Sequence, residues 1–262
     1  MNIFSVIGLI LGGVVFFIGL RLASENMMMF VDYPSMFIVL GGTFAATAIC
    51  FQLDRITQLF KIFLSHILGG KKINYPKLIA NIMQIGESYR SGEGMENLTG
   101  KADDPFLKEA LELIGEGFLD SKHLLRLLED RMENMNKIRM ADAGKIRTLS
   151  QFPPAFGMMG TTIGMIVLLA NLGGEDAMKM IGPAMGVCII TTLYGVVVAN
   201  LVVIPIGENL IESAKDIHQK NQIILEGVKH IIAKSNPVVV AEELNSFLLP
   251  GDRLDWKEVV KG

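Results

Sequence analysis

Four long apolar runs that contain no Asp, Glu, Lys, Arg or His constrain this chain more than any other feature of its sequence. They cover residues 3–20, 33–51, 152–172 and 181–206, and they are 18, 19, 21 and 26 residues long. A helix needs roughly 20 apolar residues to cross the hydrocarbon layer of a membrane. The runs therefore predict an all-α membrane protein whose four transmembrane helices come in two pairs.

Two other interpretations of these runs are weaker. A soluble helical protein is possible in principle, but buried helices rarely extend this far without a charge, and the mean hydropathy of +0.42 is high for a soluble domain. A secretory signal peptide is an alternative for the first run only. Met1 and Asn2 supply no positive charge, and the run exceeds the usual hydrophobic region of a signal, so we expect Met1 to begin the mature chain.

Lys and Arg are distributed unequally around the runs, which predicts the orientation of the chain. The short connections 21–32 and 173–180 hold only Arg21 and Lys179, whereas basic residues are frequent in the 53–151 segment and after residue 206. Both termini are therefore expected in the cytoplasm. The expected domains are a transmembrane hairpin over 1–52, a cytoplasmic helical domain over 53–151, a second hairpin over 152–206 and cytoplasmic helices over 207–262.

Punctuation signals predict where the cytoplasmic helices begin and end. Asp104-Pro105 and Asn236-Pro237 each combine a capping side chain with a proline suited to the first helical turn. The stretch 91–94, Ser-Gly-Glu-Gly, interrupts a helical pattern. The net charge of −3 gives no reason to expect a nucleic acid partner, and the scattered His and Cys residues predict no metal site or cofactor.

Small residues recur four positions apart inside the runs, a spacing that lets membrane helices approach closely. The pairs are Gly8 and Gly12, Gly160 and Gly164, and Gly182 and Gly186. Packing among the helices of one chain and packing between copies in a homo-oligomeric ring both explain this spacing.

Hydroxyl groups are concentrated in the third and fourth runs, at Thr161-Thr162, Thr191-Thr192 and Tyr194. Intramembrane Thr commonly bonds a carbonyl of its own helix, which is the plainer explanation. Alternatively, the two Thr pairs line a polar strip, because hydroxyl and carbonyl oxygens are ligands that a sodium ion accepts in place of water.

Prolines mark the same two runs. Pro154 lies at the start of the third run, while Pro183 and Pro205 lie near the two ends of the fourth. They either punctuate the helices or introduce a kink that flexes when a nearby charge changes.

Several motifs together resemble the MotA/PomA family of flagellar stator proteins over nearly the whole chain. They are residues 30–35, Phe-Val-Asp-Tyr-Pro-Ser, followed by Gly41-Gly42-Thr43; the third-run sequence over 154–165; residues 181–185 and 191–195 of the fourth run; and Asn236-Pro237 with Phe247-Leu248 and Arg253 in the tail. The resemblance implies a pentameric ring in the bacterial inner membrane, around a single-span, peptidoglycan-binding partner of the MotB/PomB type. The partner's membrane Asp would carry the ion, and a rotor protein of the FliG type would receive the torque.

The resemblance also implies roles for particular residues. Thr161, Thr191, Thr192, Asp32 and Tyr194 are the expected ion pathway, with sodium favoured over the proton and a transient sodium ion expected near Thr161 and Thr191. Asp32 is expected at the outer mouth. Family prolines that couple ion passage to movement correspond to Pro154 and Pro205.

The expected rotor-contact charges are Arg90, Glu93 and Glu96. Here the chain departs from the family pattern, because Tyr89 stands where an Arg is usual and Asn97 where a Glu is usual. A solvated helix face is the plainer explanation of these charges. The alternative function is an energy-transducing subunit of the TolQ/ExbB type. An enzyme is not expected, because the sequence holds no nucleophile–base or metal constellation.

Overall fold

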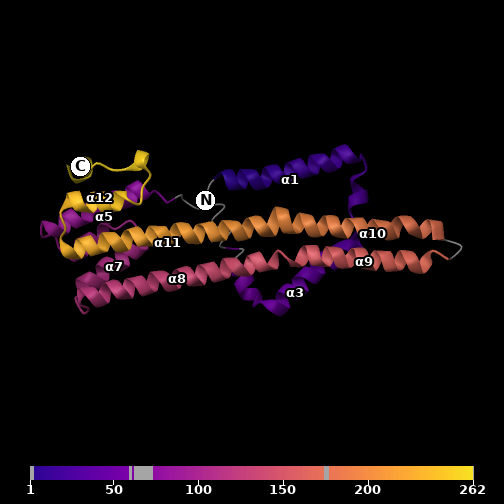
Figure 1. Cartoon of the computed structure of the whole chain (residues 1–262), viewed down its shortest axis with the longest axis horizontal. Helices are drawn as coiled ribbons and strands as arrows, with labels where there is room; N and C mark the ends of the chain where they lie inside the picture. The colour runs from indigo at the N-terminus through magenta and orange to yellow at the C-terminus, as the bar shows by residue number, and fades with distance from the viewer. Residues whose placement is uncertain (1–2, 59–60, 62–72, 174–176, 262) are drawn as a thin grey trace. The chain divides into compact units, whose positions relative to one another are not determined.

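The computed structural model describes residues 3–58, 61, 73–173 and 177–261. Over these ranges the chain forms helices and turns and no β-strand, so the all-helical fold class is confirmed. The chain divides into two compact units (Figure 1). Unit 1 comprises Met1–Lys71 with Arg139–Glu212, and unit 2 comprises Lys72–Ile138 with Ser213–Gly262.

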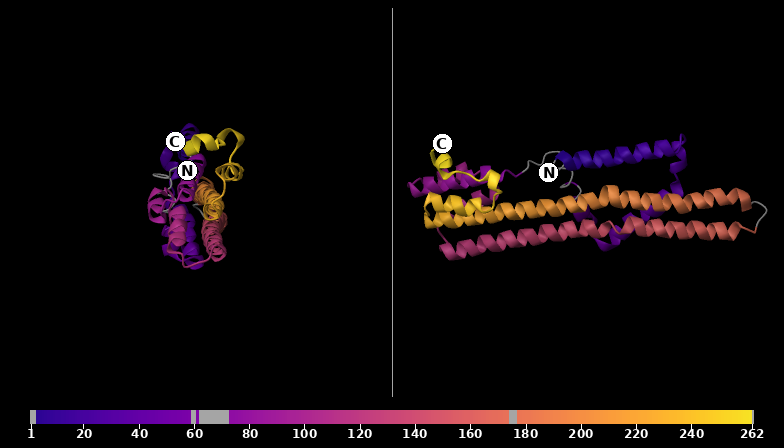
Figure 2. Two further views of the ribbon diagram at one scale, coloured as in Figure 1. Left: turned by 90° about the vertical axis from the view of Figure 1, so that its left-hand side faces the viewer. Right: turned by 45° about the horizontal axis from the view of Figure 1, so that its top comes forward.

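Unit 1 holds the apolar helices. In chain order these are α1 (Ile3–Ala23), the 3₁₀ turn η1 (Met27–Phe30), α2 (Tyr33–Met36), the π-helical turn η2 (Phe37–Gly41), α3 (Gly42–Cys50), α9 (Phe152–Asn171), α10 (Ala177–Val197) and the π-helical turn η3 (Val198–Val203). Two longer helices, α8 (Ser121–Leu149) and α11 (Ile204–Ala233), contribute residues to both units. Helices α9 and α10 run side by side, as Figure 1 and the right-hand view of Figure 2 show.

Three helical stretches in the described ranges are long and apolar enough to cross a membrane. They are Met27–Cys50, Ser121–Asn171 and Met178–Ala233, and they overlap the second, third and fourth predicted spans but extend beyond them. The first predicted span overlaps the shorter apolar helix Ile10–Ala23 within α1. A fourth crossing therefore stays a prediction.

Glycines set the close approach of α9 to α10. A Cβ atom on Gly164 would lie 2.6 Å from Sγ of Cys188, and one on Gly160 would overlap the side chain of Thr191. The pair Gly160 and Gly164 therefore serves packing within one chain. By contrast, a Cβ atom on Gly182 or Gly186 would meet nothing within 4 Å in the described part of the chain.

The π-helical turn η3 ends just before Pro205, and the proline explains it. Proline has no N–H to donate, and its ring collides with the carbonyl four residues earlier in a regular α-helix, here that of Leu201. Widening the preceding turn to π geometry relieves this collision without ending the helix.

Unit 2 is a helical domain with an aliphatic core. Its own helices are α5 (Tyr75–Arg90), α6 (Met95–Lys101), α7 (Pro105–Glu116), α12 (Pro237–Asn245) and α13 (Trp256–Lys261), with the 3₁₀ turn η4 (Pro250–Asp252). The most deeply buried core side chains come from nearly every one of these helices and from α8 and α11: Ile79, Ile82, Ile85, Leu98, Leu107, Leu111, Leu128, Ile223, Ile224, Ile231 and Leu244.

The predicted helix starts in unit 2 are confirmed. The Asp104 carboxylate accepts the N–H of Phe106 at 2.8 Å, and the Asn236 side chain accepts the N–H of Val238 at 3.0 Å. The interruption over 91–94 is also present, since α5 ends at Arg90 and Gly92 has a φ of +98°. Asp104 makes a second contact, accepting a hydrogen bond from Lys220 of α11 at 2.5 Å.

Candidate functional site

The threonine hydroxyls of the α9–α10 hairpin bond to the main chain of their own helices. Thr191 is fully buried, and its Oγ1 donates to the carbonyls of Val187 at 2.7 Å and Cys188 at 3.1 Å. Its side chain packs into the space left by Gly160. At Thr191 the structure therefore agrees with the plainer explanation of the sequence pattern, in which the hydroxyl bonds a carbonyl of its own helix.

Thr161 and Thr192 also donate to carbonyls of their own helices, but their side chains are more exposed than that of Thr191. Thr161 is half-buried and donates to the carbonyl of Met158 at 2.6 Å, while the exposed Thr192 donates to the carbonyl of Cys188 at 3.3 Å. Within the described ranges these hydroxyls are not hydrogen-bonded to one another. Each donates its proton and keeps oxygen lone pairs that remain able to accept a cation.

Asp32 and Tyr194 are brought together, through the main chain. The Tyr194 hydroxyl donates to the carbonyl of Phe30 at 2.6 Å and accepts the N–H of Asp32 at 3.1 Å. The Asp32 carboxylate is occupied locally, because it caps α2 by accepting the N–H of Ser35 at 2.8 Å and also its hydroxyl. Asp32 therefore lies beside the middle of the predicted 181–206 span, and Tyr194 lies three residues after Thr191.

The two prolines have different surroundings. Pro154 lies in the first turn of α9, where a Cβ atom on Gly195 of α10 would come within 3.2 Å of the Pro154 Cα, so the helices touch there. Pro205 borders a hollow of about 400 Å³, which Gly8 and Gly12 of α1 also line. Asn209 lines the same hollow, and its buried Oδ1 has no hydrogen-bond partner among the residues that the structure describes.

The expected rotor-contact charges lie in unit 2, and two of them are ion-paired. Arg90 forms a two-pronged contact with Glu87, with nitrogen–oxygen distances of 2.8 and 3.0 Å. Lys101 Nζ lies 2.7 Å from both oxygens of Glu93, and this hydrogen bond holds the pKa of Glu93 below its ordinary value. The sequence interpretation missed Glu87, although its spacing of three from Arg90 on a helix was visible.

Glu96 lies in an acidic groove between α6 and α7. Glu112 and Glu116 line this groove with Glu96, and its volume is about 730 Å³. The sequence interpretation did not link these acids, because α6 and α7 meet only through tertiary packing.

A charge cluster on α8 was also missed. Asp142 is buried, and it accepts hydrogen bonds from Arg55 Nε at 3.2 Å and from Lys145 Nζ at 2.9 Å. Burial alone would raise the pKa of Asp142, but the hydrogen bonds and charges of the two cations outweigh it and lower this pKa. In the sequence, the basic residues of this segment had served only to predict how the chain is oriented in the membrane.

Comparison with known proteins identifies the family. Residues 99–223 match the model of the MotA/TolQ/ExbB proton channel family. Motility protein A of Aquifex aeolicus is 32% identical over 254 residues, which cover 93% of this chain and 95% of that protein. The chain belongs to this family, as a stator subunit of the MotA/PomA type. A second relative, the chemotaxis protein PomA of Vibrio alginolyticus, is 29% identical over 97% of this chain and 98% of that protein.

Solved structures agree on the fold. The chain resembles one in the structure of C. jejuni MotAB with a TM-score of 0.84, at 21% identity and covering 97% of this chain and 99% of that one. A chain in the Bacillus subtilis MotAB stator complex gives a TM-score of 0.83 at 23% identity. MotA-type proteins are inner-membrane ion-channel subunits that serve motility, and they are not enzymes. The α9–α10 hairpin and its hydroxyls fall inside the matched 99–223 region.

Proposed function

We propose that this MotA-type chain forms a homo-oligomeric ring, expected to be a pentamer, whose four spans per subunit surround a MotB/PomB-type partner. Both termini face the cytoplasm, and sodium flow through ring and partner turns the ring against a rotor protein of the FliG type. The observation that carries the proposal is the lack of Asp, Glu, Lys, Arg and His in all four predicted spans. An ion relay inside a membrane ordinarily needs ionisable groups, so another chain must supply them.

Three further observations support a partner and neighbouring copies. The two similar solved structures are described as MotAB and as a MotAB stator complex. The faces around Gly182 and Gly186 are open in the single chain, which leaves room for a second helix backbone. Finally, large apolar side chains on α9 and α10, such as Ile166 and Ile189, are exposed and need lipid or protein to cover them.

The preference for sodium rests on the oxygen atoms around Thr191. Tyr194 follows Thr191 by three residues on α10 and its hydroxyl accepts the N–H of Asp32, while Thr161 and Thr192 present hydroxyls on the same hairpin. A sodium ion entering this region would find hydroxyl and carbonyl oxygens in place of its water ligands. Pro154 and Pro205 then transmit the local change along α9 and α11, and the hollow beside Pro205 gives that helix room to move.

Torque reaches the rotor through the charged side chains of unit 2. Glu96, in its groove with Glu112 and Glu116, presents concentrated negative charge to a basic rotor surface. Arg90 and Glu93 are partly neutralised by Glu87 and Lys101, so they contribute less to the long-range field.

The test of this function is rotation speed when sodium is replaced by potassium at constant pH and membrane potential. Rotation speed should fall steeply as the sodium concentration is lowered. Unchanged speed would exclude sodium coupling and leave the proton, while a non-motile null strain that the gene fails to restore would exclude the stator role. Changing Thr161 and Thr192 together to Val tests the site itself, and Thr47→Val in α3, whose hydroxyl bonds the carbonyl of Thr43 at 2.7 Å, is the matched control.

A further inference from the structure

Three side chains of metal-binding type meet where α12 folds back on α11. Glu226 and His230 are four residues apart on α11, so they share a face of that helix. Glu243 comes from α12. One ligand atom from each residue lies within 4.8 Å of the other two.

The turn between the helices fixes this meeting. Lys234 takes a φ of +51°, which ends α11, and the N–H of Ser235 donates to the carbonyl of His230 at 3.1 Å. Asn236 and Pro237 then begin α12 in the opposite sense. As a result, Nε2 of His230 lies 2.9 Å from a carboxylate oxygen of Glu243.

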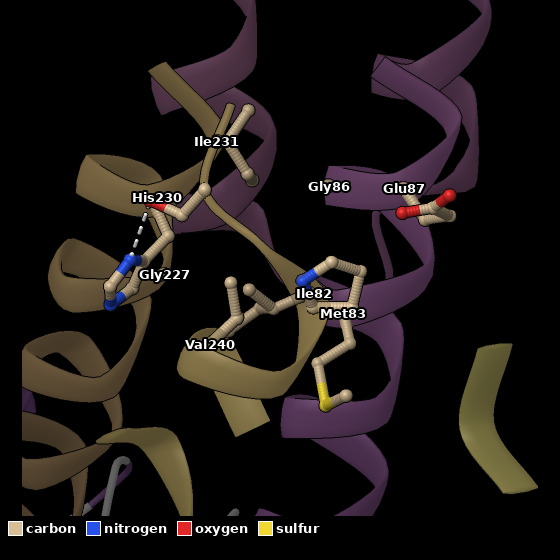
Figure 3. Close-up of a pocket in the computed structure, with 10 residues that line it drawn as sticks. Ile82, Met83, Gly86, Glu87, Gly227, His230, Ile231 and Val240 are labelled. Carbon is tan, nitrogen blue, oxygen red and sulfur yellow. Dashed lines mark hydrogen bonds between the residues drawn. The ribbon is translucent and has the colours of Figure 1, made fainter. Parts of the chain in front are cut away.

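His230 is held in the orientation that a metal ligand requires. Its Nδ1 lies 3.1 Å from Oγ of Ser235, as the dashed line in Figure 3 shows, and only 10% of its side chain is exposed. When Nδ1–H donates to that hydroxyl, Nε2 carries the lone pair and points toward Glu243. A hydrogen bond to the second ring nitrogen is the usual way in which proteins orient a metal-binding histidine.

The cluster is open to solvent on the side of Glu243. The small pocket of about 20 Å³ that His230 lines with Gly227 and Val240 lies beside the cluster, and neither Glu226 nor Glu243 lines it (Figure 3). The Glu243 side chain is half exposed, at 52%, so an ion can reach the cluster directly from solvent.

The charges around the cluster favour a divalent cation. Two carboxylates meet one histidine, with their ligand atoms within 4.8 Å of one another, and Lys229 Nζ lies 2.7 Å from Glu226. One divalent ion would neutralise both carboxylates, whereas Lys229 neutralises only one. Lys229 therefore competes with a metal ion for Glu226, and its side chain is partly exposed.

We propose that Glu226, His230 and Glu243 bind a divalent transition-metal ion of the zinc class, with water as the fourth ligand. One imidazole nitrogen and two carboxylate oxygens suit Zn²⁺, whereas Mg²⁺ and Ca²⁺ prefer oxygen alone. Ligand atoms around tetrahedral Zn²⁺ lie about 3.3 Å apart at metal–ligand distances of roughly 2.0 Å, so modest rotation of the Glu side chains closes the site. The bound ion clamps α12 onto α11, and this proposal is independent of the proposed motor function.

The test compares Glu243→Gln with Glu242→Gln in the tag-free, full-length chain in detergent. Glu242 is the neighbouring exposed acid on α12 and lies outside the cluster, so it matches the change in charge. Chelator-treated protein is titrated with Zn²⁺ by calorimetry, and its thermal unfolding is followed with and without the ion. Wild type and Glu242→Gln should bind Zn²⁺ and gain thermal stability, while Glu243→Gln should bind at least about tenfold more weakly.

A second substitution, Lys229→Met, removes the competitor for Glu226 and should strengthen Zn²⁺ binding. Equal Zn²⁺ binding by Glu243→Gln and Glu242→Gln, or no binding by any of these proteins, would overturn the proposal. Circular dichroism before the titration confirms that every variant is folded, which an exposed Glu→Gln change permits.

Discussion

Unit 1 and unit 2 place their apolar side chains in opposite ways. In unit 2, Leu107 and Ile79 are fully buried in a core that the unit completes by itself. In unit 1, Ile166 and Ile189 are 61% and 64% exposed. The threonine hydroxyls of the same helices donate hydrogen bonds to main-chain carbonyls of the helix that carries them. Unit 2 has the pattern of a domain folded in water, whereas unit 1 is completed by lipid and by other chains.

The largest test of this contrast pairs one aliphatic truncation in each unit. Leu107→Ala removes a fully buried side chain and should cost about 2–5 kcal/mol of unfolding free energy, because a cavity remains. Ile166→Ala removes an exposed side chain and should leave the stability of the isolated subunit nearly unchanged. Thermal unfolding of each purified variant in detergent makes the comparison. Equal losses would mean that Ile166 is packed within the subunit as Leu107 is, contrary to its exposure.

A smaller effect is expected from two glycines of the α9–α10 hairpin. Gly164→Ala places a methyl group 2.6 Å from Cys188 Sγ and 2.9 Å from the carbonyl oxygen of Ala184, and should destabilise the hairpin by about 1–3 kcal/mol. Gly186→Ala meets nothing within 4 Å among the described residues of the same chain and should leave the hairpin as stable as before. Subunit stability and the size of the assembled complex are measured for both. Loss of the complex alone in Gly186→Ala would identify that face as a contact with another chain.

A third prediction concerns the buried hydroxyl of Thr191. Thr191→Val keeps the packing against Gly160 but removes one oxygen, worth about 1 kcal/mol, so about fivefold more sodium should be needed for half-maximal speed. Thr47→Val loses a comparable backbone-bonded hydroxyl from α3 and should leave the sodium dependence unchanged. Equal sodium dependence in the two variants would assign Thr191 a packing role only.

The smallest predicted effect is the pH dependence of the Glu93–Lys101 pair on the surface of unit 2. Lys101 lowers the pKa of Glu93 in the folded protein. The pair therefore stabilises the fold at pH values above the ordinary glutamate pKa of about 4.3, and this contribution disappears as pH falls through the lowered pKa. Wild type should melt slightly above Glu93→Gln at pH 7 and together with it in acid. A gap that widens in acid would contradict the sign of the shift.

Features encoded by neighbouring residues could be predicted from the sequence, and those made by distant residues could not. The capped starts at Asp104 and Asn236 depend on a few consecutive side chains, and the structure contains them. The apolar spans are equally local, and three of the four overlap helical stretches long and apolar enough to cross a membrane. The contact of Tyr194 with Phe30 and Asp32 joins segments more than 160 residues apart, and no local pattern signals it. The same holds for the pairing of His230 with Glu243, which depends on the left-handed turn at Lys234.

The threonine hydroxyls of the α9–α10 hairpin show a related limit of prediction from the sequence. The sequence located Thr161, Thr191 and Thr192 on two adjacent helices, but it left open whether they face a pathway or their own backbone. Consecutive threonines on a helix point about 100° apart, so Thr191 is buried against Gly160 while Thr192 is exposed. Only the packing of α9 on α10 decides which of the two is buried.

The lack of ionisable residues in the predicted spans implies that the ion-carrying acid belongs to another chain. Motor rotation tests this directly after the intramembrane carboxylate of the proposed MotB/PomB-type partner is changed to an amide, with assembly of the complex checked in the same membranes. Rotation should stop while the complex stays intact, and Asp32→Asn should only alter the sodium dependence. Continued rotation with the partner's amide, or its complete loss with Asp32→Asn alone, would contradict this assignment of the acid.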